Sequence, residues 1–88
     1  MKLKDGFILR EVAGSYVVVA VGKRTKEFNG VINLSQTAAD IWKLLKLDTT
    51  EEEVVQKMQE KYDVEKSVLS KDVTAFIGKL REAGLIEE

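Results

Sequence analysis

The side chains that most often carry out catalysis or bind metals are scarce in this sequence. The chain has no His and no Cys, so it lacks imidazole acid–base groups and thiolate ligands. Carboxylates are plentiful, and Glu51, Glu52 and Glu53 are consecutive. Because this run follows a helix cap at Thr50, it is better interpreted as solvated charge that compensates the helix dipole than as a metal or acid–base site. The sequence therefore predicts a protein without catalytic activity, metal or cofactor.

The composition is that of one small globular domain spanning residues 1–88. Hydrophobic residues make up 44% and charged residues 33%, and the formal net charge is −1. This near-neutral balance argues against binding to nucleic acids, and no apolar run reaches the length of a membrane span. The N-terminus lacks the hydrophobic region of a signal peptide, so we expect a cytoplasmic location and no membrane partner.

Two segments at the start of the chain predict a β-hairpin. Phe7–Val12 and Tyr16–Val21 are rich in β-branched and aromatic residues, and residues 13–15 between them include a Gly. A polar loop over residues 22–26 should follow, and then a third strand over residues 27–33.

Three helices are expected after the strands. Ser35 can cap the first helix, whose apolar positions share one face and include Trp42, so we expect Trp42 in the core. Thr50 can cap the second helix, and the third should run from about Val68 to Ala83, ended by Gly84. Three strands followed by three helices predict an α+β domain with a small antiparallel sheet against the helices.

The third strand is expected to lie at an edge of the sheet. It has no Pro, and no charged residue lies between Phe28 and Leu34. Such an edge is covered by a helix, paired with a second copy of the chain, or used to bind an extended peptide as an added strand. Main-chain N–H groups alternate along a strand, and the sequence leaves open which set faces the edge. One set belongs to Asn29, Val31 and Asn33, and the other to Phe28, Gly30 and Ile32.

The third helix offers two candidate walls for a peptide groove, one on each side of its apolar centre. One border holds Asp72, Phe76, Lys79 and Ala83, and the other holds Ser70, Thr74, Ile77 and Arg81. Both borders mix apolar and charged residues, as the wall of a groove for an amphipathic peptide would. A solvated flank has the same pattern, so the sequence leaves both borders open.

Three blocks of the sequence together resemble the PqqD-like family, whose members are also called RiPP recognition elements. They are INLSQTAADIWKLL over residues 32–45, TTEEEVVQKMQEKYDV over residues 49–64, and DVTAFIGKLREAGLIE over residues 72–87. The first block is the most specific of the three. One departure is Leu47-Asp48, where such proteins often carry an Asp-Gly turn.

This resemblance implies a winged-helix-like domain, with a three-stranded antiparallel sheet followed by three helices and no catalytic activity. Members of the family bind the leader of a ribosomally made precursor peptide and present it to a modifying enzyme, often a radical-SAM maturase. The leader lies along the third strand and in the groove beside the third helix. The candidate contact residues are then Phe28, Asn29, Gly30, Val31, Ile32 and Asn33 from the strand, and Asp72, Phe76, Ile77, Lys79 and Leu80 from the helix.

Two other classes of function remain as alternatives. A winged-helix domain can bind DNA, although the near-neutral charge argues against this because phosphate contacts dominate such binding. The chain could also be a structural module that forms a homodimer through its third-strand edge.

Overall fold

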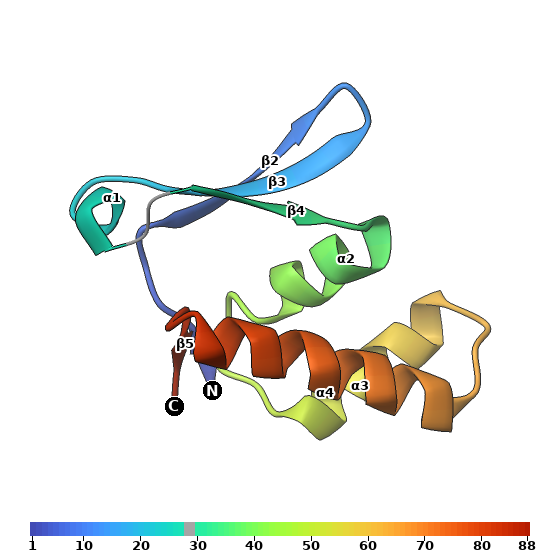
Figure 1. The fold of residues 1–88 in the computed structure, drawn as a ribbon. Helices are drawn as coiled ribbons and strands as arrows, with labels where there is room; N and C mark the ends of the chain where they lie inside the picture. Colours follow the sequence, from blue (N-terminus) through green and yellow to red (C-terminus); the bar gives the residue numbers. More distant parts are fainter. Residues whose placement is uncertain (28–29) are drawn as a thin grey trace.

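The computed structural model describes residues 1–27 and 30–88 of the chain. A small sheet lies on one side of the molecule and the longer helices lie on the other (Figure 1). The α+β architecture predicted from the sequence, with a three-stranded antiparallel sheet, is confirmed. The elements in chain order are β1 (Lys2–Leu3), β2 (Phe7–Val12), β3 (Ser15–Ala20), α1 (Arg24–Glu27), β4 (Val31–Leu34), α2 (Gln36–Leu44), α3 (Glu51–Lys61), α4 (Lys66–Glu82) and β5 (Ile86–Glu87).

The predicted hairpin is present as β2 and β3. Val12 lies opposite Ser15, so the turn has two residues. Both of them have positive φ, 51° at Ala13 and 80° at Gly14. This backbone matches the twist of the flanking strands, and a Gly at the second position adopts it without strain.

The third strand begins later than the sequence predicts. We expected a polar loop over residues 22–26 and a strand over residues 27–33, whereas α1 covers Arg24–Glu27 and β4 covers Val31–Leu34. Main-chain hydrogen bonds between residues three apart form the short helix. Gly30 has a φ of 145°, which side-chain-bearing residues rarely adopt, so the regular strand starts only after it.

The sheet has the order β2-β3-β4, so β3 is the central strand and β4 lies at one edge. Both strand pairs are antiparallel. The cross-strand neighbours Leu9, Val18 and Ile32 turn their side chains toward the helices, and Val18 is fully buried. The residues that alternate with these along each strand point to the other face of the sheet, away from the helices. Val31, on that face, is 56% exposed.

The caps predicted for α2 and α3 are both formed. Ser35 Oγ accepts a hydrogen bond from the Ala38 N–H at 3.1 Å, and Thr50 Oγ1 accepts one from the Glu53 N–H at 3.1 Å. The Glu53 carboxylate does not complete a reciprocal capping box, because it accepts a hydrogen bond from the Thr49 hydroxyl instead. Each cap satisfies one N–H group of the first turn that has no partner within the helix.

The core forms between the sheet and the inner faces of the helices. Trp42 is fully buried there, as the sequence predicts. The other buried apolar residues in the described part of the chain come from β3, the three longer helices and the segments that directly follow α2 and α4: Val18, Ala39, Ile41, Leu45, Val54, Val55, Met58, Leu69, Val73, Ile77, Leu80, Leu85 and Ile86. None of the helices in the described part of the chain is both long and apolar enough to cross a membrane.

Gly84 ends α4 as predicted, with a φ of 80°. The Leu85 N–H donates to the Leu80 carbonyl at 2.9 Å, and Leu85 packs back into the core. The turn leads into β5, which pairs with β1 in a two-stranded sheet that the sequence did not predict. This pairing brings the N- and C-terminal residues together at one end of the molecule (Figure 1).

Candidate peptide-binding site

The main-chain groups at the open edge of the sheet can be assigned from the strand register. The Val21 N–H donates to the Gly6 carbonyl at 2.9 Å, just beyond the last pair of the β2–β3 ladder. Main-chain groups alternate sides along a strand, so the odd-numbered residues of β3 face β2 and the even-numbered ones face β4. On β4 the even-numbered residues Ile32 and Leu34 lie opposite Val18 and Tyr16 and face back toward β3.

Val31 and Asn33 therefore direct their N–H and carbonyl groups away from β3, toward the open side of β4. Both side chains are exposed to solvent. This resolves which of the two alternating sets faces the edge. Two N–H groups and two carbonyls are thus placed to pair with an extended chain.

A groove lies beside this edge. In Figure 1, β4 lies above α2 and α4 lies below α2. The strand β4 and the helix α4 run in opposite directions. A pocket of about 340 Å³ opens between α2 and α4. Ser35, which directly follows β4 and caps α2, is one of its lining residues. The others are Thr37, Ala38 and Ile41 from α2, and Asp72, Ala75, Phe76 and Lys79 from α4.

The pocket distinguishes the two borders of α4 that the sequence leaves open. Asp72, Phe76 and Lys79 line it, with Phe76 half-buried and the other two exposed. On the opposite border, Arg81 turns to Glu51 and Glu88, with ion-pair distances of 3.6 Å and 2.5 Å. The border of Asp72 is therefore the one that shares a pocket with α2 and with Ser35, the residue that follows β4.

Two predicted contact residues on α4 are not accessible. Ile77 is fully buried and Leu80 is 2% exposed, and both belong to the hydrophobic core. Their side chains lie on the inner face of the helix, away from the solvent side of the groove. The sequence-based assignment of Ile77 and Leu80 as peptide contacts stays a prediction, and their burial does not favour it.

The remaining predicted residues precede β4. Gly30 is exposed and lies directly before the strand. Phe28 and Asn29 lie outside the described residues. The structure thus brings Val31 and Asn33 to the open edge and Asp72, Phe76 and Lys79 to the adjacent groove, while the side chain of Ile32 turns inward.

A polar cluster between α2 and α3 was not predicted from the sequence. The Tyr62 hydroxyl donates a hydrogen bond to Asp40 Oδ2, and Lys61 Nζ lies 3.1 Å from Asp40 Oδ1. Burial by itself would raise the pKa of Asp40, but the hydrogen bonds from Tyr62 and Lys61 and the Lys61 charge together hold that pKa below its usual value. The hydrogen bond that Tyr62 donates to Asp40 also raises the pKa of Tyr62. Each of these polar groups has its partner within the cluster, so the cluster has a structural role and links α2 to the end of α3.

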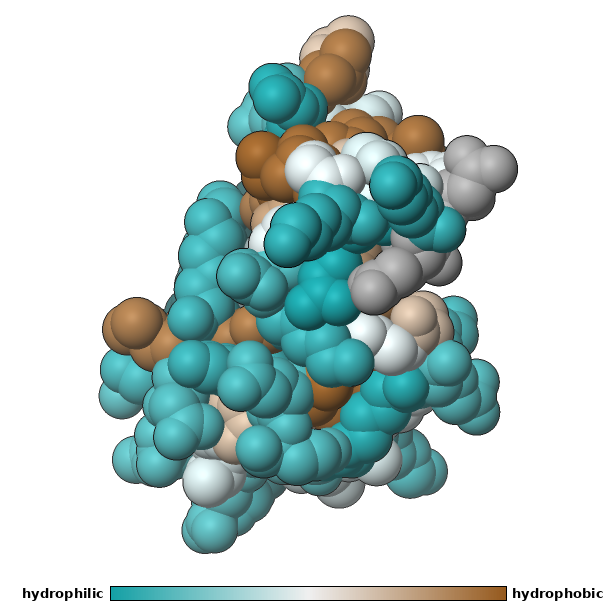
Figure 2. All heavy atoms as spheres, turned by 90° about the vertical axis from the view of Figure 1, so that its left-hand side faces the viewer, coloured by the Kyte–Doolittle hydropathy of each residue, from teal (hydrophilic) through white to brown (hydrophobic). Residues whose placement is uncertain are grey.

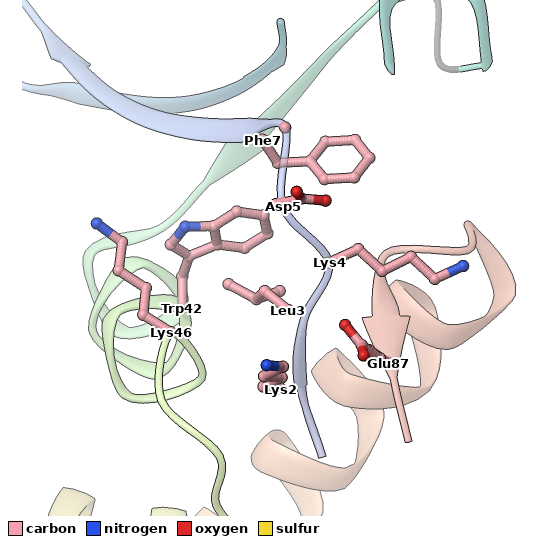
Figure 3. Close-up of a pocket in the computed structure, with 9 residues that line it drawn as sticks. Lys2, Leu3, Lys4, Asp5, Phe7, Trp42, Lys46 and Glu87 are labelled. Atoms are coloured by element: carbon pink, nitrogen blue, oxygen red, sulfur yellow. The ribbon is translucent and has the colours of Figure 1, made fainter. Parts of the chain in front are cut away.

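Another pocket, of about 560 Å³, lies at the end of the molecule where β1 pairs with β5. Trp42 lines it together with Lys2, Lys4 and Lys46, and Figure 3 shows Lys4 and Lys46 extending to opposite sides. Their ammonium groups therefore do not converge on one ligand position. Figure 2 shows mostly hydrophilic side chains on this face of the molecule, with apolar atoms gathered at the top over the sheet.

Acidic side chains in the described ranges do not form a metal centre. Within residues 1–27 and 30–88, no three Asp or Glu side chains lie close enough together to bind a metal ion. The Glu51–Glu53 run lies in the first turn of α3, where carboxylates compensate the helix dipole.

The fold is similar to that of a solved structure described as TbiB1 in complex with the TbiA(beta) leader peptide. The TM-score is 0.77 at 22% sequence identity, and the alignment covers 99% of this chain and 95% of that chain. No curated protein sequence matches this chain.

A family model described as coenzyme PQQ synthesis protein D (PqqD) matches residues 15–86. The match extends from β3 to β5, so it includes β4, α2 and α4, which form the edge and the groove. The chain therefore belongs to the PqqD family.

Proposed function

We propose that this protein binds the leader of a ribosomally made precursor peptide and presents it to a modifying enzyme, without catalysing a reaction itself. Membership of the PqqD family supports this proposal, as does the likeness of its fold to TbiB1, which was solved with a leader peptide. The observation that carries the proposal is the open edge at Val31 and Asn33 beside the groove of Asp72, Phe76 and Lys79.

The leader is proposed to add to β4 as a fourth strand. Its main chain would pair with the N–H and carbonyl groups of Val31 and Asn33, which have no neighbouring strand on that side among residues 1–27 and 30–88. Main-chain pairing alone does not supply specificity, and ordering a flexible peptide costs about 2–5 kcal/mol. Side chains of the leader that enter the groove between α2 and α4 would contribute the remaining affinity.

Proline substitutions on β4 test this mechanism, because proline removes one N–H group and is tolerated mainly where that group faces an edge. Asn33→Pro and Val31→Pro should stay folded but lose the peptide. Ile32→Pro should unfold the domain, because the Ile32 main chain faces β3. Val31→Thr is the matched control, since it changes the side chain and keeps the N–H group.

The measurement is binding of fluorescent leader peptides, synthesised from the short reading frames beside the gene, together with thermal unfolding of each variant. A leader that binds Asn33→Pro, Val31→Pro and Val31→Thr with equal affinity would rule out strand addition at this edge.

We further propose that the modifying enzyme is a radical-SAM maturase. Membership of the PqqD family supports this choice. Reconstitution with the enzyme encoded beside this gene tests it: modification of the precursor should fall when Asn33→Pro replaces the wild-type protein. A modifying enzyme of another class at that locus would contradict the proposal.

A further inference from the structure

Two opposite charges stand on the groove side of α4. Asp72 and Lys79 both line the pocket, and both side chains are exposed. They are seven residues apart, which is about 10 Å along a helix axis. Within residues 1–27 and 30–88, neither side chain has an ion-pair partner. Both charges are therefore available to a peptide in the groove.

The direction of the added strand decides which end of the peptide meets each charge. The β2–β3–β4 sheet is antiparallel throughout, and antiparallel pairing is slightly more stable per residue than parallel pairing. A peptide antiparallel to β4 runs in the same direction as α4, because β4 and α4 run oppositely (Figure 1). Its N-terminal part then lies nearer Asp72 and its C-terminal part nearer Lys79.

Apart from Ser35 and Thr37, the other residues that line the pocket with the two charges are apolar. They are Ala38, Ile41, Ala75 and Phe76. In an extended peptide every second side chain faces the same way, with about 6.7 Å between them. Two such steps give about 13 Å, slightly more than the span from Asp72 to Lys79. The side chains of Lys, Arg and Glu are long and flexible enough to make up this difference.

We propose that this groove selects peptides by charge order: a Lys or Arg, then a large apolar residue two positions later, then an Asp or Glu two positions after that. This inference rests on the proposed function and specifies its substrate class. The basic residue pairs with Asp72, the apolar residue enters the pocket beside Phe76, and the acidic residue pairs with Lys79. The reverse order would place like charges together at both ends, which suppresses binding of wrong partners.

Selection from a library of short random peptides displayed on phage tests the proposal without knowledge of the natural leader. The wild-type protein and the double variant Asp72→Lys with Lys79→Asp are used in parallel. Both substituted side chains are exposed, so the double variant should fold as the wild type does. We expect the wild type to enrich the basic–apolar–acidic order and the double variant to enrich the reverse.

Two synthetic peptides of equal composition then measure how strongly the protein prefers one charge order over the other. Both take their flanking residues from an enriched sequence, and their centres are Lys-Thr-Ile-Thr-Glu and Glu-Thr-Ile-Thr-Lys. Fluorescence anisotropy should show the wild type binding the first about fivefold more tightly than the second, with the preference inverted in the double variant. The preference should shrink as salt is added, because both pairs are exposed.

The outcomes separate this inference from the proposed function. Peptides that lose binding on Asn33→Pro but show no charge order, or an order unaffected by the double variant, would overturn the charge-order inference alone. A library that yields no peptide dependent on the Asn33 main chain would overturn both.

Discussion

The Tyr62 hydroxyl donates a hydrogen bond to Asp40 Oδ2, which links the end of α3 to the middle of α2. Asp40 is only 7% exposed, and Lys61 provides its second partner. Asp40 belongs to α2, so the link helps to hold in place the helix on which Ala38 and Ile41 line the pocket.

Tyr62→Phe should lower the midpoint of thermal unfolding. The substitution removes one hydrogen bond to a poorly exposed carboxylate while keeping the aromatic ring that packs against the core. Differential scanning calorimetry at neutral pH measures the shift. An unchanged midpoint would mean that water replaces the Tyr62 hydroxyl without loss.

Acid should weaken the contribution of Asp40 to stability. The pKa of Asp40 in the folded protein is below its usual value of 3.8, so folding favours the ionised carboxylate. Its contribution is complete above the unfolded pKa and is lost as the pH falls through the lower folded pKa. The stability difference between the wild type and Asp40→Asn should therefore be largest near neutral pH and should shrink below about pH 4. Urea unfolding across this range measures it, and a constant difference would contradict the assignment.

Trp42→Ala should cost about 3–5 kcal/mol of folding stability, because it leaves a large cavity in a fully buried position. Urea denaturation gives the free energy of unfolding. Trp42→Phe is the control, since it keeps an aromatic ring and removes the buried Nε1 group, which has no hydrogen-bond partner among the described residues. Near-normal stability of Trp42→Ala would show that the residue is not part of the core.

Two glycines of the α4 region should respond to alanine in opposite directions. At Gly78 a Cβ would meet no atom within 4 Å from the described residues outside its own stretch of helix backbone, so Gly78→Ala should stabilise the helix by about 0.5–1 kcal/mol. Gly84 has a φ of 80°, so Gly84→Ala should destabilise by about 1–2 kcal/mol. Thermal unfolding of both variants under the same conditions checks the pair. A loss of stability in Gly78→Ala would indicate that a neighbour needs the close approach.

Features set by neighbouring residues in the chain could be predicted from the sequence. The Ser35 cap, the buried position of Trp42 and the turn at Gly84 each depend on local patterns, and all three are found. The start of β4 could not be predicted, because residues that favour a strand do not reveal the helical turn of α1 or the φ of Gly30.

The candidate site was only partly predictable for a different reason. An amphipathic helix shows which residues are apolar, but the packing of α2 and α3 decides which border of α4 stays open. Phe76 and Ile77 are adjacent in sequence, yet Phe76 lines the groove and Ile77 lies in the core. The link from Asp40 to Tyr62 joins residues 22 positions apart and leaves no local pattern in the sequence.

The contrast between Phe76 and Ile77 gives a test of the groove. Phe76→Ala removes a half-buried ring from the pocket and should weaken binding of a leader peptide about tenfold, as expected for an aromatic contact in an interface. Ile77→Val removes one methylene from a fully buried side chain, so it should lower stability by about 0.5–1.5 kcal/mol and leave the affinity unchanged. Isothermal titration calorimetry and urea unfolding of both variants separate the two effects. If Ile77→Val weakened binding of the peptide as much as Phe76→Ala did, the groove would have to open onto the other border of α4.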